Sequence, residues 1–215
     1  MSVAPTSPLV KRTYDARRRR DAARLRREHV LDHAAELMLR DGYAATTVAA
    51  IAEAAGVSTP TIYKRYGGKA GLVKALHARA LQGAEPTPAE RRSDALRSTA
   101  TAREIVAGWA ELATEVAPRV APVLLLVRDA AATDPEMRDL AVALEAARHR
   151  RMVSNARVLA ARGLLRQGVS RRHAADVMYA LTSAETYELL VLRRGWSSRA
   201  FGDYVREQLT CALLG

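Results

Sequence analysis

Residues 48–66 read VAAIAEAAGVSTPTIYKRY, a pattern that predicts two short helices joined by a tight turn. Gly56 would form the turn, because glycine adopts a positive φ without steric strain. Ala52 is small where the two helices would approach most closely, and Val57 and Ile62 would fill the angle between them. The stretch therefore predicts a helix-turn-helix over residues 48–66.

The second of these helices has the composition of a helix that reads DNA. Ser58 is a preferred N-cap residue, and Pro60 suits a first helical turn. Any corner between two helices would use glycine and small residues in this way, so the flanking sequence has to decide. The side chains able to reach bases and phosphates are Thr59, Thr61, Tyr63, Lys64 and Arg65.

The flanks of this motif share an ordered set of residues with a known family. These residues are Val30, Leu31, Asp32, Ala34, Leu37, Gly42, Tyr43, Thr46, Thr47, Val48, Ile51, Ala52, Ala55, Gly56, Val57, Ser58, Ile62, Tyr63, Tyr66, Lys69 and Leu72. With them, residues 30–76 resemble the DNA-binding head of TetR-type regulators. Met38 and Tyr66 stand where that family commonly has phenylalanine, and both keep a largely apolar core residue. The rest of the chain matches the family only in length and helical layout.

The resemblance implies a role for individual residues of the head. Thr47 would cap the helix that touches the DNA backbone, and Tyr63 and Lys69 would hold phosphates beside the major groove. Bases would face Thr59, Pro60, Thr61 and Lys64. With the basic segment described next, the expected DNA-binding residues are Arg17, Arg18, Arg19, Arg20, Thr47, Ser58, Thr59, Pro60, Thr61, Tyr63, Lys64 and Lys69.

Positive charge is concentrated in the first part of the chain. Residues 1–82 hold 15 basic and 7 acidic side chains, whereas residues 83–215 hold 19 and 16. A polyanionic partner is therefore expected for the N-terminal third. Residues 1–16 are predicted to form a disordered basic arm which, with Arg17–Arg20, enters a minor groove or follows phosphates. The alternative is a solvated run of charge without a specific role.

Other locations and chemistries find little support in the sequence. No apolar run has the length of a signal peptide or of a membrane span, so a soluble, cytoplasmic protein is expected. A single cysteine, Cys211, provides no disulfide framework. His29 and His33 lie four residues apart but have no evident third metal ligand. Residues 67–71 are rich in glycine, yet they lack the spacing of a phosphate-binding loop. We expect no enzyme, no cofactor and no metal.

Helical spacing recurs throughout the chain, which predicts an all-α fold of about nine helices, with a three-helix head on a larger helical domain. The expected divisions are an arm over 1–16, a head over 17–82, a linker over 83–98 and a C-terminal domain over 99–215. Thr101 and Glu104 match a capping box, and Pro118 should break or kink the helix that they open. Asp134 and Ser170 should cap two further long helices, the second reaching residue 194.

The resemblance implies that the C-terminal domain forms a homodimer and binds a small-molecule effector. An unidentified, mostly apolar effector is expected in a cavity between the helices. Ordinary core packing is the competing interpretation of every cavity residue. The expected cavity residues are Trp109, Leu112, Val116, Leu124, Arg128, Met152, Tyr179 and Glu185. The expected dimer interface is Leu181, Leu189, Leu192, Tyr204, Val205 and Leu209.

The sequence thus predicts a sequence-specific transcriptional regulator that binds an operator in double-stranded DNA. A repressor released by its effector is the favoured form, with activation left open. Two other classes remain as alternatives. One is an ungated or architectural DNA-binding protein without an effector, and the other is a basic helical protein that binds anionic membrane surfaces.

Overall fold

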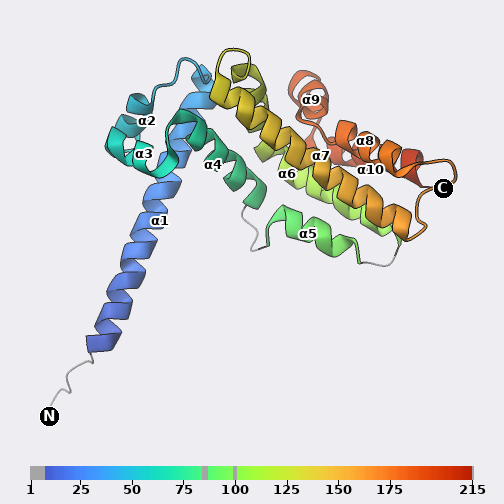
Figure 1. Ribbon diagram of the computed structural model, residues 1–215, viewed down its shortest axis with the longest axis horizontal. Helices are drawn as coiled ribbons and strands as arrows, with labels where there is room; N and C mark the ends of the chain where they lie inside the picture. Colours follow the sequence, from blue (N-terminus) through green and yellow to red (C-terminus); the bar gives the residue numbers. More distant parts are fainter. Residues whose placement is uncertain (1–7, 84–86, 99–100, 215) are drawn as a thin grey trace, which may run out of the picture. The chain divides into compact units, whose positions relative to one another are not determined.

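The computed structural model describes residues 8–83, 87–98 and 101–214, with side chains from Leu25 onward. These residues form ten α-helices and one π-helical segment, and they contain no strand (Figure 1). The all-α prediction is confirmed. The elements are α1 (Pro8–Asp41), α2 (Val48–Ala54), α3 (Thr59–Tyr66), α4 (Lys69–Gln82), α5 (Ala89–Leu96), α6 (Ala102–Ala130), α7 (Pro135–Ala161), α8 (Arg171–Leu181), α9 (Ala184–Tyr187), η1 (Glu188–Arg193) and α10 (Ser198–Leu213).

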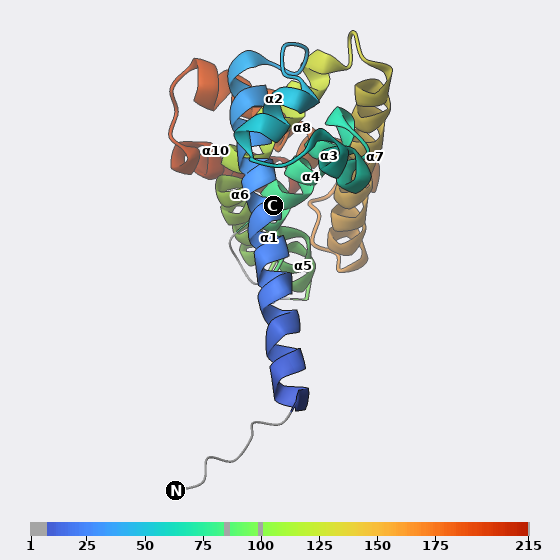
Figure 2. The same cartoon turned by 90° about the vertical axis from the view of Figure 1, so that its left-hand side faces the viewer.

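The chain divides into two compact units, one reaching Leu72 and the other starting at Val73. The division falls inside α4, so this helix contributes to both units. In the first unit α1, α2 and α3 bury a small apolar core, which includes Met38, Ile51 and Ile62. Figure 2 looks onto this unit, with α2 and α3 crossing α1. Met38 is fully buried, as expected of a residue that replaces a core phenylalanine.

Helix α1 begins earlier than the sequence predicts. The expected start was about Arg17, after a disordered arm, but the backbone is helical from Pro8. Proline fits the first turn of a helix, and no glycine or further proline follows before Gly42. Lysine, arginine and alanine between them favour helix strongly. The predicted disorder is therefore wrong for residues 8–16, whereas residues 1–7 lie outside the described residues.

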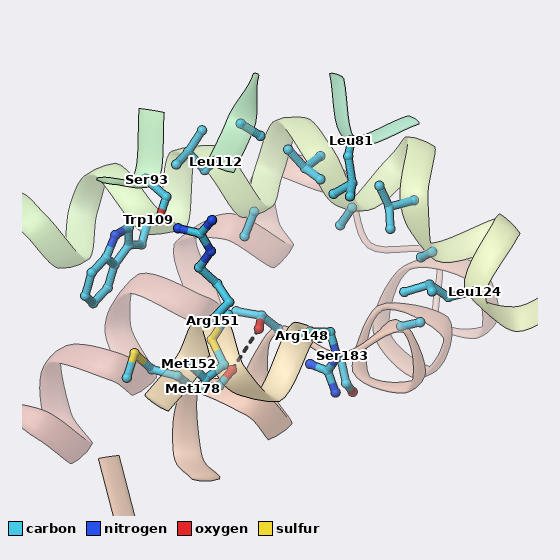
Figure 3. A pocket seen from close by; sticks show the side chains of 18 of the residues that line it. Leu81, Ser93, Trp109, Leu112, Leu124, Arg148, Arg151, Met152, Met178 and Ser183 are labelled. Carbon is cyan, nitrogen blue, oxygen red and sulfur yellow. Dashed lines mark hydrogen bonds between the residues drawn. The ribbon is translucent and has the colours of Figure 1, made fainter. Parts of the chain in front are cut away.

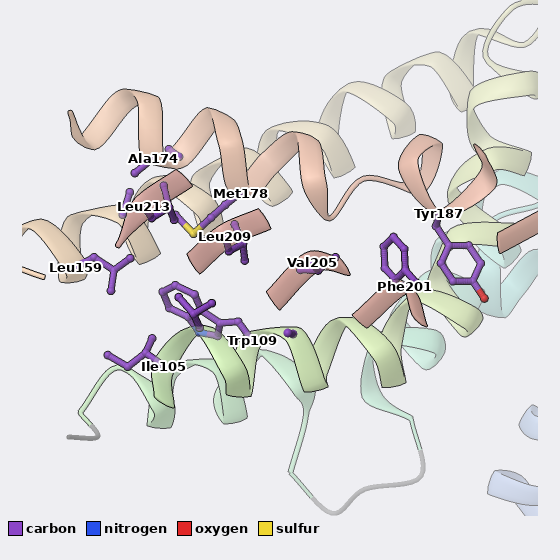
Figure 4. Close-up of a cluster of buried hydrophobic side chains, with 14 of the residues drawn as sticks. Ile105, Trp109, Leu159, Ala174, Met178, Tyr187, Phe201, Val205, Leu209 and Leu213 are labelled. Carbon is purple, nitrogen blue, oxygen red and sulfur yellow. The ribbon is translucent and has the colours of Figure 1, made fainter. Parts of the chain in front are cut away.

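The core of the second unit lies between α6, α7, α8 and α10. Phe201, Val205, Leu209 and Leu213 recur every fourth residue on α10 and point into a cluster that contains Trp109 (Figure 4). Glycine at 202 lets α10 approach α6 very closely, since a Cβ there would lie 1.7 Å from Thr114 Oγ1. The last helix is thus an internal part of its own unit.

The predicted linker over 83–98 is wrong for residues 89–96, which form α5. Prolines and charges suggested an extended segment, but Ala89, Ser93 and Leu96 share one face of a helix, and the first two are buried. Pro88 occupies the N-cap position and Glu90 the first turn. The segment folds because its small apolar face packs on α6, a tertiary effect that local composition does not reveal.

The predicted break at Pro118 is also wrong, because α6 continues through Pro118 and Pro122 to Ala130. A proline inside a helix removes one backbone donor and disturbs the preceding turn. In that turn Arg119 Nη1 donates a hydrogen bond of 2.9 Å to the carbonyl oxygen of Glu115. A side chain thus supplies a donor to the disturbed turn, and burial of the helix on both sides of it favours continuity.

The helix capped by Ser170 is shorter than predicted. Ser170 Oγ accepts a hydrogen bond from His173 N, as expected, but α8 ends at Leu181 instead of near residue 194. Ser183 then caps the single turn of α9, which passes into the π-helical segment η1. Thr182 and Ser183 turn their hydroxyls to backbone groups, and such bonds compete with a continuous helical ladder.

Candidate nucleic-acid interface and cavity

The turn between α2 and α3 has the predicted geometry. Gly56 has a φ of +63°, which glycine adopts without strain. Val57 N donates a hydrogen bond of 2.9 Å to the carbonyl oxygen of Ala52, and this bond closes the turn. Ile62 is buried and anchors α3 from its inner side. The first unit therefore contains a helix-turn-helix whose second helix is held by its apolar face.

The outer face of α3 is polar and open. Ile62 alone among the α3 residues is buried, and Tyr63 is 52% exposed. The other exposed side chains of the helix are Pro60, Thr61, Lys64 and Arg65, and Thr59 is half-buried. All four residues predicted to face bases lie on this short helix. This face carries hydrogen-bonding, aromatic and cationic groups that take no part in the packing of the core.

Two hydroxyls at the helix starts behave differently. Thr47 Oγ1 accepts a hydrogen bond of 3.0 Å from Ala50 N, so Thr47 caps α2 as predicted. Ser58 stands at the N-cap position of α3, but its hydroxyl makes no capping bond within the described head. Instead, Ser58 Oγ lies 2.8 Å from Thr61 Oγ1. Ser58 is thus the N-cap residue of α3, as predicted, but it makes no side-chain capping bond, and both hydroxyls stay exposed.

Lys69 lies at the start of α4 and contacts the chain itself. Its Nζ donates hydrogen bonds to the carbonyl oxygens of Tyr43, at 2.6 Å, and Thr46, at 3.0 Å. The same ammonium lies 4.0 Å from the centre of the Tyr43 ring. These contacts join α4 to the loop before α2. Lys69 therefore has an internal role in addition to the phosphate contact that the resemblance implies.

The basic residues Arg17–Arg20 lie in the described backbone of α1, but their side chains lie outside the described residues. Their helical backbone places them on a helix ahead of the helix-turn-helix. Lys11 and Arg12 belong to the same helix. Their expected contacts with DNA stay a prediction.

A cavity of about 280 Å³ lies in the second unit, between α4, α5, α6, α7, α8 and α10. Five of the predicted cavity residues line it, namely Trp109, Leu112, Val116, Leu124 and Met152. Figure 3 shows Trp109 and Ser93 at one end and Leu124 at the other. The walls are mainly apolar. Four of these five residues lie on α6 and Met152 lies on α7, and an effector at this place stays a prediction.

The three predicted polar anchors lie elsewhere. Arg128, Tyr179 and Glu185 line a second hollow of about 530 Å³, which shares Leu124 and Arg148 with the first cavity. Arg128 is also engaged already, since its Nη1 donates a hydrogen bond of 2.8 Å to Glu188 Oε2, which raises the pKa of the guanidinium. The grouping of all eight residues in one cavity is therefore wrong. Tyr179 lies on α8 and Glu185 on α9, on opposite sides of the break after α8.

The polar groups that do line the first cavity were missed by the sequence reasoning. Ser93 lies on α5, which was taken for a linker, while Arg148, Arg151 and Asn155 lie on α7. On α7 these residues recur with Leu144 and Met152 at helical spacing. Polar residues interrupting an apolar stripe were the signal that could have revealed them.

The predicted dimer residues divide into two groups. Leu189 and Leu192 on η1 are each 54% exposed, and Leu181 and Tyr204 are half-buried. Val205 and Leu209 are buried in the core of their own unit, so their assignment to a surface is wrong. They lie on the face of α10 that packs against α6. Trp196, which was not predicted, is 39% exposed close to η1 in sequence.

The described residues contain neither a metal-binding cluster nor a membrane-spanning helix. No group of three or more His, Cys, Asp or Glu side chains in this part of the chain is arranged to hold a metal ion. His29 and His33 pack edge to face, with ring centres 4.7 Å apart. Among the helices described here, none has the length and apolar character needed to cross a membrane.

Comparison with known sequences identifies the head. The family model described as bacterial regulatory proteins, tetR family, matches residues 30–76. An uncharacterized HTH-type transcriptional regulator of Bacillus subtilis (strain 168), YvkB, is 47% identical over 49 residues. That match covers 23% of this chain and 26% of the relative, so the chain spans about a quarter of the length of the curated protein that it matches.

Solved structures share the fold over most of the chain. A transcriptional regulator from Saccharomonospora viridis, in complex with choline, has a TM-score of 0.67 at 22% identity and covers 90% of this chain and 99% of its own. NalD of Pseudomonas aeruginosa, the secondary repressor of the MexAB-OprM multidrug efflux pump, has a TM-score of 0.67 at 20% identity, covering 90% and 98%. FadR of Bacillus subtilis, in complex with stearoyl-CoA, has a TM-score of 0.67 at 22% identity, covering 85% and 96%. Residues 30–76 thus match the TetR-family model, and the chain as a whole shares the fold of these solved regulators.

Proposed function

We propose that this protein is a sequence-specific transcriptional repressor that a small-molecule effector releases from its operator. The observation that carries the proposal is the exposed polar face of α3, fixed from behind by buried Ile62 in a helix-turn-helix. A short helix with this presentation can enter a major groove and reach base edges. The proposal involves no catalysis, and the protein would act in the cytoplasm beside the chromosome.

Each expected DNA contact has a distinct task in this proposal. Thr59, Pro60, Thr61 and Lys64 face bases and give sequence preference, and Ser58 supports the start of α3. Thr47, Tyr63 and Lys69 bind phosphates and set the position of the head on the duplex. Arg17–Arg20 add contacts that do not depend on base sequence. The excess of 15 basic over 7 acidic side chains in residues 1–82 supports this arrangement.

A homodimer is the proposed functional unit, because two recognition helices are needed to contact successive turns of the duplex. Exposed apolar side chains favour η1 as part of the interface, through Leu189 and Leu192. Half-buried Leu181 and Tyr204 lie on the flanking helices α8 and α10. Pairing of such faces across a two-fold axis would bury these side chains.

The cavity between α5, α6 and α7 is the proposed effector site. Structures with the same fold contain choline in one case and stearoyl-CoA in another, which supports a ligand site in folds of this kind. An effector would act by population shift, binding more tightly to a conformation whose two heads fit the operator poorly. The loss of DNA affinity would then equal the difference in its affinity for the two conformations.

A gel shift with the DNA upstream of the protein's own gene tests the proposal. At fixed salt, the upstream fragment should shift in the presence of excess scrambled competitor. An architectural protein would instead bind both DNAs equally. Binding to anionic vesicles that DNA does not displace would favour a membrane-surface role. Either of these results would contradict the proposed function.

A further inference from the structure

Arg148 on α7 occupies the wall between the two hollows of the second unit. It lines both of them, together with Leu124 and Ser183. Its Nη1 donates a hydrogen bond of 2.6 Å to the carbonyl oxygen of Tyr179, and the guanidinium lies 3.7 Å from the centre of the Tyr179 ring. Figure 3 shows the Arg148 side chain directed to the end of the cavity where Ser183 lies. These contacts fix the guanidinium while leaving most of its donors available.

The charge of Arg148 is paired with one partly exposed carboxylate. The nearest carboxylate, that of Glu145, lies 3.5 Å from Arg148 Nε, and Nε has no hydrogen-bond partner within the described chain. The Glu145 side chain is 48% exposed, whereas that of Arg148 is 17% exposed. Water therefore screens the acid, while the guanidinium is largely desolvated, and this burial lowers the pKa of Arg148. A largely buried charge in such a place gains from a further acceptor besides Glu145.

A nearby ion pair in the same unit, between Arg92 and Glu115, has two hydrogen bonds between guanidinium and carboxylate. Arg92 on α5 donates two hydrogen bonds to the Glu115 carboxylate, of 2.6 and 2.8 Å. Arg148 has the same planar fork, but its carboxylate partner Glu145 lies 3.5 Å from Nε and makes no such two-bond pair, and both side chains line the cavity. A carboxylate placed in the cavity could accept charge-assisted hydrogen bonds from the Nη groups of Arg148, because Nε is buried and faces Glu145.

Two other groups on the cavity wall also favour a ligand that accepts hydrogen bonds. Arg151 is the other guanidinium on the wall, and it is 25% exposed against 61% for Glu90. Arg151 binds Asp94 on α5 at closer range than Arg148 binds Glu145. Trp109 Nε1 is a buried donor without a partner in the described residues. The two acids that line the cavity, Glu90 and Glu145, are more exposed than its two arginines.

We propose that the ligand of this cavity is a carboxylate attached to an apolar body, with its head group on Arg148 and its body directed toward Trp109. This inference rests on the proposed effector site and names the chemical class that the site accepts. Arg148 and Asn155 both line the cavity on α7, which gives it a length of about 10 Å along that helix at about 1.5 Å per residue. Decanoate is therefore a suitable probe.

Fluorescence of Trp109 can report binding directly, without DNA. The chain has two tryptophans, so Trp196→Phe leaves Trp109 as the single reporter. Decanoate, decanol and decylamine share one body and differ in head group. We expect decanoate to bind at least about tenfold more tightly than the other two, because it alone completes Arg148 with charge-assisted bonds. Arg148→Gln should remove this preference while decanol binding persists.

Two further variants protect the test against misfolding. Arg150→Gln changes an exposed arginine on the same helix that lines neither hollow, and it should keep the preference for decanoate. Arg148→Lys keeps the charge without the fork and should give an intermediate preference. Equal binding of the three probes, or tighter binding of decanol or decylamine, would overturn the head-group assignment while leaving an effector cavity in place. If none of the three binds, both the assignment and the effector site are wrong, whereas the gel shift still tests DNA binding separately.

Discussion

Arg92 and Glu115 join α5 to α6 through two parallel hydrogen bonds, of 2.6 and 2.8 Å. Glu115 Oε1 also accepts a hydrogen bond of 3.0 Å from Arg119 Nη2. Arg119 Nε in turn donates to the carbonyl oxygen of Ala80 near the end of α4, at 3.1 Å. One carboxylate therefore organises contacts among three helices that surround the cavity.

Replacing this carboxylate should destabilise the second unit. Glu115→Gln is expected to lower the free energy of unfolding by about 1–2 kcal/mol at neutral pH, since hydrogen bonds to charged groups contribute about 1.5–3 kcal/mol and this site is partly exposed. Urea unfolding measures the loss. Glu111→Gln, an exposed position one turn earlier, is the matched control and should change little.

The effect of Glu115 should depend on pH. Hydrogen bonding from Arg92 lowers the pKa of Glu115 below its ordinary value of 4.5. A lowered pKa in the folded state adds stability that is complete above the unfolded pKa and is lost as the pH falls through the folded pKa. The difference between wild type and Glu115→Gln should therefore shrink below about pH 4.5. A constant difference down to low pH would contradict the assignment.

Gly202→Ala should destabilise the protein although alanine favours helix. A Cβ at this position would lie 1.7 Å from Thr114 Oγ1 and 3.0 Å from Thr114 Cβ, so α6 and α10 would have to separate. A loss of about 1–3 kcal/mol is expected from such overpacking. Thermal unfolding measures it. Adding Thr114→Ala removes the hydroxyl and should restore part of the stability, and no rescue would argue against this contact.

Lys69→Met should affect both stability and DNA binding. Loss of the ammonium leaves the carbonyl oxygens of Tyr43 and Thr46 without their donor, which should cost about 1 kcal/mol in the head. If Lys69 also binds a phosphate, the slope of log K against log salt should fall by about 1. Lys74→Met, at an exposed site on the same helix, should change neither quantity. A stability loss with an unchanged slope would restrict Lys69 to its internal role.

The basic N-terminal segment should contribute salt-dependent affinity. Deleting residues 1–16 and changing Arg17–Arg20 to glutamine should flatten the dependence of log K on log salt, since fewer counterions are released on binding. Preference for the operator over scrambled DNA should persist because α3 is intact. An unchanged slope would leave the segment as a solvated run of charge.

Self-association should depend on η1. Leu189→Asp together with Leu192→Asp places two charges on an exposed apolar surface and should convert the dimer to monomer at micromolar concentration. Sedimentation velocity measures the change. Val142→Asp alters an even more exposed apolar residue, on α7, and should leave the dimer intact. A wild-type monomer would contradict the proposed assembly itself.

Local signals in the sequence predicted the helix starts well. Thr101 and Glu104 form the expected capping box, and Asp134 caps α7, because these bonds involve residues only three apart. The turn at Gly56 and the burial of Ile62 were predictable for the same reason. Neither depends on the rest of the chain.

Errors arose where distant residues decide the outcome. Helix α5 forms because its small face packs on α6, and α6 passes Pro118 with a side-chain donor from Arg119. Val205 and Leu209 were assigned to a surface because an apolar stripe does not say whether it faces its own chain or a second copy. The cavity residues show the same dependence on distant contacts. The apolar residues on α6 were predictable, whereas the polar side chains that reach the cavity from α7 depend on how that helix is rotated.

The π-helical segment η1 also limits how the chain length can vary. A π-helical turn holds more residues than an α-helical turn, so removing one residue between 188 and 193 could restore an ordinary helical ladder. Such a deletion would rotate every later residue of the helix by about 100° relative to α8, since an α-helix has about 3.6 residues per turn. Leu189 and Leu192 could then no longer stay outside while Leu190 and Val191 pack on the core. We therefore expect homologous chains to tolerate substitutions in this segment more readily than changes in its length.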